Sequence, residues 1–394
     1  ENRISKIIFD NIELPNLKEL AAFNNRLKNI EFTSKNLPQI TDLDLSDNLI
    51  STFKIESETL TRLVLASNRI KSFDKSDLIL PKLERIYFTS NLLLTFKPEM
   101  LTNIPMLENI YLADNFLTTV SLPPLQYMTD IYMGYNSFKN LNDIKLNSIG
   151  IVEVMNFDSN KIYKLENPET FPRDIQKFTC YLCSIRAIDP FFFSSFRSLR
   201  RLNLNQNFIT TANIFKRNNG NFVLTYIELS HNRIKRIGKN DFKHLPWLRE
   251  LELQYNEITT IADGAFDSLS NLEELIIYNN FLFNLPLNLF ESTPSLNRLW
   301  LSGNNLAYFP IPEWQKETGE FGNNTLTKLR YFFIERNPLQ CKCIDLISSW
   351  AKMKGLDAAD IDDKNVAKGT MPACVVNEQG CQSDVKKDFI KDFW

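Results

Sequence analysis

Apolar residues recur along the chain in a spacing that neither a lone strand nor a lone amphipathic helix requires. The segment LRRLNLNQNFI begins at Leu199 and places its apolar and asparagine positions in the order Leu-x-x-Leu-x-Leu-x-x-Asn-x-Ile. The same order begins again at Leu224, Leu248, Leu272 and Leu296, so successive starts are 25, 24, 24 and 24 residues apart. Self-similarity at a fixed period of this size is typical of a solenoid.

Further copies of the pattern precede and follow these five, which gives fourteen units in all. They begin at Leu17, Ile40, Leu60, Leu83, Leu107, Met128, Val152, Ile175 and Leu329. A degenerate strand is also expected near Ile4. The unit that begins at Ile175 carries Cys183 where the others carry asparagine.

Each Leu-x-Leu segment predicts a short strand, because alternate side chains of a strand point to opposite sides. The chain must then turn back, and the amides and carbonyls of a buried turn need hydrogen-bonding partners. An asparagine side chain both donates and accepts, so it can bond its own coil and the next one. We therefore expect a ladder of Asn25, Asn48, Asn68, Asn91, Asn115, Asn136, Asn160, Asn207, Asn232, Asn256, Asn280, Asn304 and Asn337, with a weak point at Cys183.

Phenylalanine recurs on the side of the coil opposite to the strand. Phe193, Phe242, Phe266 and Phe290 each lie six residues before the first leucine of the next unit. Stacked coils would place these rings in a column, and burying each ring contributes roughly 1.5–3 kcal/mol. This column accounts for much of the high phenylalanine count of 30 without any ligand.

The tandem pattern over residues 17–339 resembles the leucine-rich repeat superfamily. The resemblance implies an α/β repeat solenoid, a horseshoe with a concave parallel β-sheet and convex loops or short helices. The 24-residue units with their phenylalanine resemble the extracellular class of the superfamily. We expect three parts: an N-terminal strand or cap at 1–16, about fourteen repeats at 17–339, and a cysteine-containing cap at 340–394.

Four of the six cysteines follow the last repeat, at Cys341, Cys343, Cys374 and Cys381. Their arrangement after Asn-Pro-Leu resembles the disulfide C-terminal cap of extracellular leucine-rich repeat proteins. Four cysteines allow three pairings, and the resemblance implies Cys341–Cys374 and Cys343–Cys381. A zinc site fits this spacing poorly. Disulfides indicate an oxidising compartment, so we expect a secreted or outward-facing protein.

Cys180 and Cys183 occupy the third apolar position and the asparagine position of their unit. A Cys-x-x-Cys spacing is also that of a redox motif. Because the repeat register accounts for both residues, we favour two buried small side chains or one local bridge. No cysteines precede Leu17, so the N-terminal cap either lacks disulfides or is incomplete.

Composition points away from several function classes. The net charge is −2, with 45 basic and 47 acidic residues, which provides no field for nucleic acid or an anionic membrane. No run of about 18 apolar residues predicts a transmembrane helix. The two histidines, His231 and His244, have no nucleophile beside them in the pattern, and no phosphate-binding glycine loop occurs. We expect no enzymatic activity, no cofactor and no metal.

The spacing widens to 33 residues between the last two units, through the polar segment IPEWQKETGEFGNNTLTK. We interpret this segment as a protruding loop. It holds the one Asn-x-Thr acceptor of the chain, at Asn323, and a surface sequon in a secreted protein predicts glycosylation. An unused sequon on a solvated loop is the alternative.

The outward strand positions define the predicted binding surface. In chain order the central ones are Ala21, Asp44, Val64, Tyr87, Tyr111, Tyr132, Asn156, Thr179, Asn203, Glu228, Glu252, Ile276, Trp300 and Phe333. Neighbouring strands lie about 4.8 Å apart. The three consecutive tyrosines should therefore form one stacked strip, which Tyr135 is expected to extend.

A second apolar strip is expected where Ile276, Trp300 and Phe333 lie together with Tyr331. Acidic side chains precede it along the chain, at Glu228, Glu250, Glu252 and Glu274. Aromatic ladders can simply favour strand pairing, but exposed Trp, Tyr and Phe together are unusual on a soluble surface and dominate interfaces. We interpret Tyr87, Tyr111, Tyr132, Tyr135, Glu228, Glu252, Trp300, Tyr331 and Phe333 as ligand-binding residues.

Two function classes follow. The first is a secreted recognition module of innate immunity, because the repeats and cap look like insect immune repeat proteins, mosquito leucine-rich immune proteins among them. That resemblance implies protein partners such as complement-like factors or another repeat protein. The second is the ectodomain of an adhesion or Toll-like receptor. An intracellular scaffold is a third, more distant reading, which reduced cysteines would support.

Overall fold

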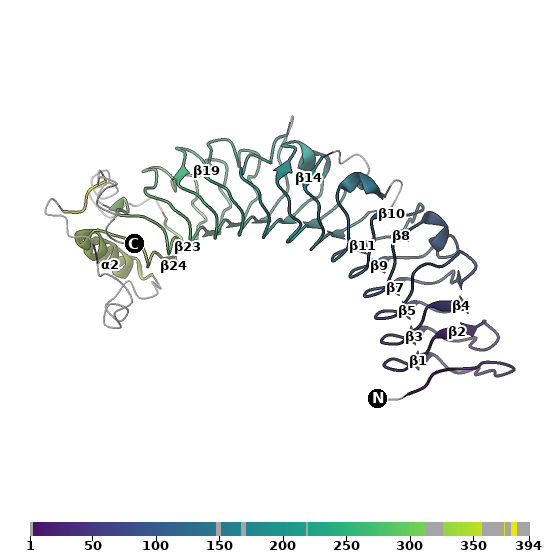
Figure 1. Ribbon diagram of the computed structural model, residues 1–394. Helices are drawn as coiled ribbons and strands as arrows, with labels where there is room; N and C mark the ends of the chain where they lie inside the picture. Colours follow the sequence, from purple (N-terminus) through teal and green to yellow (C-terminus); the bar gives the residue numbers. More distant parts are fainter. Residues whose placement is uncertain are drawn as a thin grey trace. The chain divides into compact units, whose positions relative to one another are not determined.

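The structure is a computed structural model that describes residues 3–146, 151–166, 171–217, 220–311, 326–356, 374 and 380–383 (Figure 1). The chain forms two compact units. Unit 1 consists of Glu1–Ile185 and Ser195–Leu199, and unit 2 of Arg186–Ser194 and Arg200–Trp394. Each unit is built of stacked coils, so the predicted repeat fold is confirmed within each of them.

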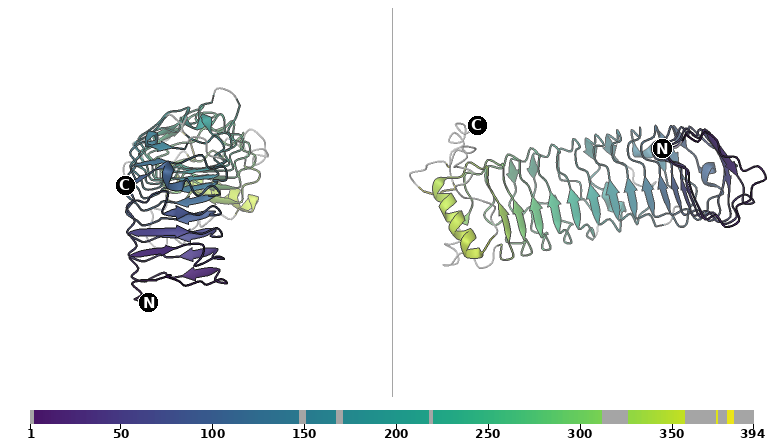
Figure 2. Two further views of the ribbon diagram at one scale, coloured as in Figure 1. Left: turned by 90° about the vertical axis from the view of Figure 1, so that its right-hand side faces the viewer. Right: turned by 90° about the horizontal axis from the view of Figure 1, so that it is seen from below.

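Each described coil of unit 1 contributes one short strand to a parallel sheet, in chain order (Figure 2). The strands are β1 (Glu19–Ala21), β3 (Asp42–Asp44), β5 (Arg62–Val64), β7 (Arg85–Tyr87), β9 (Asn109–Tyr111), β11 (Asp130–Tyr132), β13 (Val154–Asn156) and β15 (Lys177–Thr179). The middle residue of a strand points into the core: Leu43 and Ile110, for example, are fully buried. The first and third residues point outward.

Unit 2 repeats this arrangement. Its strands are β17 (Arg201–Asn203), β18 (Tyr226–Glu228), β20 (Glu250–Glu252), β22 (Glu274–Ile276), β23 (Arg298–Trp300) and β24 (Tyr331–Phe333). All are parallel, and equivalent residues of neighbouring coils are partners, as with Glu228 and Glu252 or Trp300 and Phe333. Every outward column is therefore in register within the unit.

Shorter elements form the other side of the coils. Two three-stranded sheets lie in unit 1, one of β2 (Asn29–Phe32), β4 (Thr52–Glu56) and β6 (Leu78–Ile79), the other of β8 (Thr95–Phe96), β10 (Thr119–Ser121) and β12 (Ile144–Lys145). Unit 2 has the pair β19 (Arg236–Ile237) and β21 (Thr260–Ile261). The remaining short elements are β14 (Lys164–Leu165), β16 (Ala187–Ile188) and the 3-10 turns η1 (Pro98–Leu101), η2 (Leu141–Asp143) and η4 (Phe192–Ser195).

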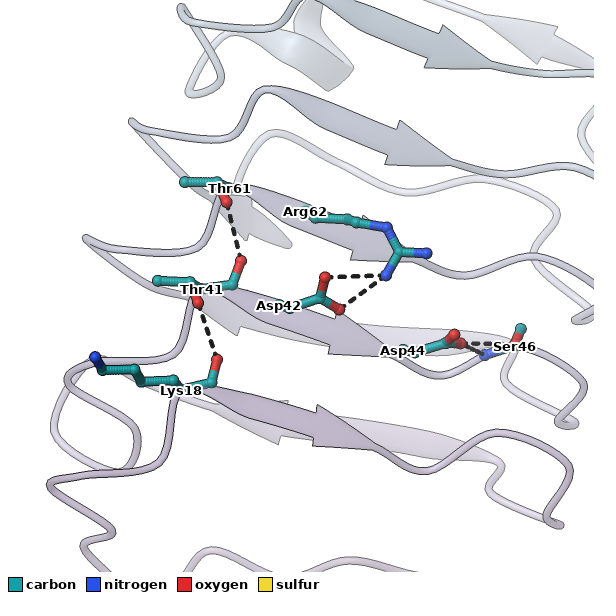
Figure 3. Close-up of polar contacts among 7 residues, drawn as sticks. All are labelled: Lys18, Thr41, Asp42, Asp44, Ser46, Thr61 and Arg62. Atoms are coloured by element: carbon teal, nitrogen blue, oxygen red, sulfur yellow. Dashed lines mark hydrogen bonds and ion pairs between the residues drawn. The ribbon is translucent and has the colours of Figure 1, made fainter.

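The asparagine ladder joins the coils where the chain turns after each strand. Asn256 is representative: its Oδ1 accepts from the Ile234 amide at 3.0 Å, and its Nδ2 donates to the carbonyls of Leu229 at 2.9 Å and Leu253 at 3.0 Å. The same bonds recur in unit 1 from Asn48 onward and in unit 2 to Asn337. Threonine hydroxyls add bonds between coils near the start of unit 1, as Figure 3 shows for Thr41, Thr61 and the carbonyls that they reach.

One position of the turn was not anticipated. The residue directly before each ladder position adopts positive φ, which lets the backbone reverse direction. These residues are Asn24, Asp47, Ser67, Ser90, Asp114, Tyr135, Ser159, Leu182, Gln206, His231, Tyr255, Asn279, Gly303 and Arg336. Asn, Asp and Gly tolerate this conformation best, and their frequency in the column was the available signal.

The ladder changes at Cys183, as expected, because Cys180 and Cys183 form a disulfide. The bridge is the local one considered above. Cys183 Sγ lies 3.2 Å from the Phe157 carbonyl oxygen, but a disulfide sulfur carries no hydrogen and cannot donate. Among the described residues, the buried Ile162 amide has no ladder asparagine of the next coil as its acceptor.

The phenylalanine column of unit 2 differs from the prediction at two positions: Phe215 joins it, and Phe290 makes no ring contact with Phe266 among the described residues. Phe193, Phe215, Phe242 and Phe266 follow one another with centroids 6.0, 6.4 and 6.2 Å apart. Phe215 was missed because its unit is 25 residues long and its ring lies out of step with the six-residue rule. Phe290 is buried as expected.

The N-terminal segment is not a strand in the described residues from Arg3 to Lys18, contrary to the expectation near Ile4. It runs along the first coil, where the Ile4 amide donates to Asn25 Oδ1 at 3.1 Å and Ile4 accepts from the Arg26 amide at 2.8 Å. Phe9 is buried and its ring packs 5.6 Å from that of Phe32.

After the last coil of unit 2, the described residues include helix α2 (Cys341–Lys354) and two disulfides. The bridges are Cys341–Cys374 and Cys343–Cys381, the pairing that the resemblance implies. Trp350 of α2 is buried against Phe332, with ring centroids 5.6 Å apart, and so covers the last coil. The predicted loop residues 312–325, including Asn323, lie outside the described residues.

We predict that Asn256→Ala lowers the free energy of unfolding of unit 2 by about 2–4 kcal/mol, because buried backbone groups of two coils lose their partners. Urea denaturation followed by circular dichroism measures the loss, and hydrogen exchange at the Ile234 amide should accelerate. Asn240→Ala is the matched control, since Asn240 is exposed and outside the ladder. Equal stability of the two variants would contradict the ladder's role.

Candidate functional site

The outward side chains of the parallel strands form what we call the open face of each unit. In unit 1 the predicted aromatic strip is present. The rings of Tyr87 and Tyr111 stack 4.2 Å apart at an interplanar angle of 7°, and those of Tyr111 and Tyr132 stack 4.7 Å apart at 3°. The strand spacing sets these distances, because the three residues are in register on β7, β9 and β11.

Stacking determines which parts of the tyrosine side chains are accessible from outside. The ring faces cover one another, so ring edges and hydroxyl groups remain for contact. Burial, together with the neighbouring Tyr87 phenol, raises the pKa of Tyr111 to about 12, so the hydroxyl stays protonated at neutral pH and can donate. The strip is therefore amphipathic, with hydrogen-bonding tips on an apolar body.

Arg62 continues the strip toward the start of unit 1. Its guanidinium carbon lies 5.4 Å from the centroid of the Tyr87 ring, and its Nη1 lies 2.8 Å from Asp42 Oδ1 (Figure 3). Asp44 instead accepts from the amide and hydroxyl of Ser46 at 2.9 and 2.6 Å. The Arg62–Asp42 pair is about a third exposed, so we expect it to orient side chains more than to stabilise the fold.

Tyr135 does not extend the stack, so that part of the prediction is wrong. It lies in the turn after β11 at φ 53° and is 59% exposed. Among the described residues its ring pairs with no other aromatic ring. The backbone reversal before Asn136 turns its side chain out of the column that Tyr132 occupies.

The open face of unit 2 carries the second aromatic strip. The rings of Trp300 and Phe333 stack 3.8 Å apart at 15°, on the neighbouring strands β23 and β24. Trp300 Nε1 donates to Glu274 Oε1 at 3.0 Å, which fixes the indole. Glu274 Oε2 also accepts from Arg298 Nη1 at 2.9 Å, and the Arg298 guanidinium lies 5.5 Å from the centroid of the Tyr331 ring.

Two of the predicted acidic residues meet on adjacent strands. Glu228 of β18 is only 6% exposed, and its partner in register is Glu252 of β20. Glu228 accepts from the amide and the hydroxyl of Ser230, and Glu252 accepts from Gln254 Nε2 at 2.8 Å. Glu274 does not join this pair, since it is occupied by Trp300 and Arg298.

Tyr226, which the sequence reasoning missed, lies between the two carboxyl groups. Its hydroxyl is 2.6 Å from Glu252 Oε1 and 3.1 Å from Glu228 Oε2. One hydroxyl has one proton, so it can donate fully to only one of them. Burial and both carboxylates raise the pKa of Tyr226, which keeps that proton in place. Its position could have been predicted from the sequence, because Tyr226 lies two residues before Glu228 and therefore points outward on the same strand.

The shared environment alters the ionisation of Glu228. Burial raises the pKa of its carboxyl group, the Glu252 carboxyl acts in the same direction, and the bonds from Ser230 act against it, with a resulting pKa of about 7. Burial, with the charges of Glu252 and Glu274, also raises the pKa of Glu250. Burial and neighbouring charge therefore disfavour the ionised forms of Glu228 and Glu250 on the open face of unit 2.

The described part of the chain contains no group of three or more His, Cys, Asp or Glu side chains arranged to hold a metal ion. Within the same residues, no helix has the length and apolar character needed to cross a membrane.

Part of the chain matches a known repeat family. A sequence model described as leucine rich repeat matches residues 58–117, 219–258 and 246–306. With the coils and the ladder described above, these matches show that the chain contains leucine-rich repeats and has the leucine-rich repeat fold. The leucine-rich repeat fold is a scaffold for protein interaction. No curated protein sequence matches the chain.

Solved structures share the fold at low sequence identity. Toll in the Drosophila Toll–Spatzle complex has a TM-score of 0.62 and 16% identity over 82% of this chain. A Leptospira interrogans leucine-rich repeat protein has a TM-score of 0.58 and 18% identity, covering 95% of this chain and 94% of its own. The complex of the mosquito immune proteins LRIM1 and APL1C has a TM-score of 0.57 and 17% identity, covering 87% of this chain and 57% of the other. This chain spans about half, 47%, of the Toll chain.

We predict that Glu228→Gln makes stability less dependent on pH. The raised pKa means that the wild-type contribution is fully present below about pH 4.5 and is lost as pH rises through about 7. Glutamine is neutral throughout, so the variant should be more stable than wild type at pH 8, by about 1–3 kcal/mol, and similar at pH 4.5. Urea unfolding at both pH values, with the exposed Glu273→Gln as control, tests this. A variant less stable than wild type at pH 8 would contradict it.

Proposed function

We propose that the chain is an extracellular recognition module of innate immunity that binds protein partners through its open faces. The stacked and partly exposed Trp300–Phe333 pair carries this proposal. Aromatic side chains that are held rigidly lose little entropy on binding, and Trp and Tyr are the most frequent binding hot spots. The bond from Trp300 to Glu274 provides that rigidity.

Other outward side chains of each unit add to its proposed binding surface. The tyrosine strip of unit 1 presents ring edges and hydroxyl groups, which suit the mixed polar and apolar surface of a protein. In unit 2, Tyr331 is 37% exposed and lies beside Phe333 on β24. Glu228 and Glu252 supply negative charge on the same face. We infer that residues 17–339 form the binding part, 340–394 the cap, and 1–16 a short N-terminal cover.

The three disulfides support an extracellular location, because disulfides form and persist in oxidising compartments. Secretion into a body fluid fits this chemistry. The solved structures of similar fold include Toll with Spatzle and LRIM1 with APL1C, which are both protein complexes. By analogy, partners of this chain would be a complement-like immune factor or a second repeat protein.

An ectodomain of an adhesion or Toll-like receptor is the second candidate, supported by the similarity of fold to the Toll chain at a TM-score of 0.62. The transcript beyond Trp394 discriminates between the two candidates. Heptad repeats there favour a secreted module that continues into a coiled coil, and an apolar run of about 20 residues favours a receptor.

We predict that Trp300→Ala with Phe333→Ala reduces capture of partner proteins from body fluid at least tenfold, because the rigid aromatic anchor is removed. Quantitative mass spectrometry of material bound to immobilised protein measures the change. Trp247→Ala is the matched control, since Trp247 is 57% exposed but lies in the segment between β19 and β20, outside the strands. Unchanged capture by the double variant would refute a binding role for this strip.

We also propose N-linked glycosylation at Asn323. Intact-mass measurement of protein from its natural source should show a glycan that is lost on enzymatic deglycosylation and absent from Asn323→Gln. A native mass equal to the polypeptide alone would show that the sequon is unused.

A further inference from the structure

The open face of unit 2 has more hydrogen-bond acceptors than donors around Glu228 and Glu252. Four carboxylate oxygens meet there, and the donors that reach them are the Tyr226 hydroxyl, the Ser230 amide and hydroxyl, and Gln254 Nε2. The Tyr226 hydroxyl lies between the two carboxyl groups but has one proton to give. The pair therefore has fewer donors than two ionised carboxylates require.

The side chain of Gln254 independently indicates a shortage of hydrogen-bond donors around Glu228 and Glu252. Gln254 is 8% exposed, and its amide lies against the Glu252 carboxylate through the 2.8 Å bond from Nε2. Its Oε1 is buried and has no hydrogen-bond partner among the described residues. A buried acceptor without a donor costs about 1–3 kcal/mol. Turning the amide over would not help, since Oε1 would then face a carboxylate.

The nearby arginines do not neutralise the negative charge of Glu228 and Glu252. Arg298 is committed to Glu274 at 2.9 Å. The guanidinium carbon of Arg201, on β17, lies over the Tyr226 ring at 4.2 Å from its centroid, and Arg201 forms no ion pair among the described residues. With Glu250 on the same strand as Glu252, the cluster has three carboxyl groups and one stacked guanidinium.

We propose that this cluster binds a basic side chain, arginine or lysine, of a protein partner. The inference rests on the proposed function and specifies the chemistry of the partner. A guanidinium or ammonium group supplies three to five donors and positive charge, which is what the two carboxylates lack. Ile276 follows Glu252 in the same outward column and Trp300 follows Ile276, so the apolar stem of the basic side chain, or an apolar neighbour in its sequence, has a surface to cover.

Ionisation of the pair should follow binding. A bound cation favours the charged form of both carboxyl groups, so Glu228, with its pKa of about 7, gives up its proton when the partner binds. The charged or titratable groups near Glu228 include Tyr226, Glu252 and Tyr278, with Arg201 and Glu250 on the strands to either side. Affinity should therefore rise between pH 6 and pH 8 in the wild type and change less in Glu228→Gln.

The test measures fluorescence polarisation with labelled hexapeptides of sequence Gly-X-Leu-X-Phe-Gly, in which X is arginine, lysine, glutamine or glutamate. We expect the arginine and lysine peptides to bind at least tenfold more tightly than the glutamine peptide, and the glutamate peptide to bind least. Glu252→Gln should remove most of this preference, because it removes one of the two carboxylates that the basic side chain would contact. Glu257→Gln is the control and should keep the preference, since Glu257 is only partly buried and pairs with Lys235 at 4.0 Å, outside the cluster.

The two proposals fail separately. Loss of affinity for all four peptides in the Trp300→Ala variant reports on the aromatic strip of the proposed function. Equal affinity of wild type for the arginine and glutamine peptides, or no binding of any basic peptide, overturns the basic-side-chain inference while capture through Trp300 can still stand. A preference for basic peptides that survives Glu252→Gln also overturns it, because the charge would then act elsewhere.

Discussion

The structure depends on a single recurring need: each coil buries a turn whose backbone amides and carbonyls have no partner within the turn. A side chain with both a donor and an acceptor satisfies two coils at once. Asn256 does so with the Ile234 amide and the Leu229 carbonyl. Because each ladder asparagine bonds the backbone of its own coil and of the preceding one, it holds neighbouring coils in place and keeps their strands in register.

The register of the strands determines which side chains are neighbours on the open face. Residues one period apart become neighbours across strands, so tyrosines on consecutive coils stack and glutamates on consecutive coils meet. Strand register has opposite energetic effects on the tyrosines and on the glutamates. It gives Tyr87 and Tyr111 a favourable ring contact, whereas it forces Glu228 against Glu252 in a site that burial deprives of water. Folding stabilises the aromatic strip and leaves the carboxyl pair in need of a donor.

The places where sequence reasoning failed share one physical cause, the path of the backbone between the regular positions. Tyr135 was expected in the aromatic strip, but positive φ at the turn carries it away. Phe215 joined the phenylalanine column because a longer unit brings it there. The first residues of the chain pack on the coil through Phe9 without forming a strand. A repeat pattern describes the common coil, and local departures from it depend on packing.

The sequence by itself determined the repeat, the strands, their inward and outward residues, the ladder and the family-implied cysteine pairs of the cap. Periodicity is enough for these features because each coil meets only its neighbours. Only the tertiary structure decided which outward groups share a proton, which acceptor is left unpaired and which guanidinium is already engaged. Those properties depend on side-chain angles and on solvent exclusion. The hydroxyl of Tyr226 between two carboxyl groups and the unpaired Oε1 of Gln254 are therefore visible only when the coils are stacked.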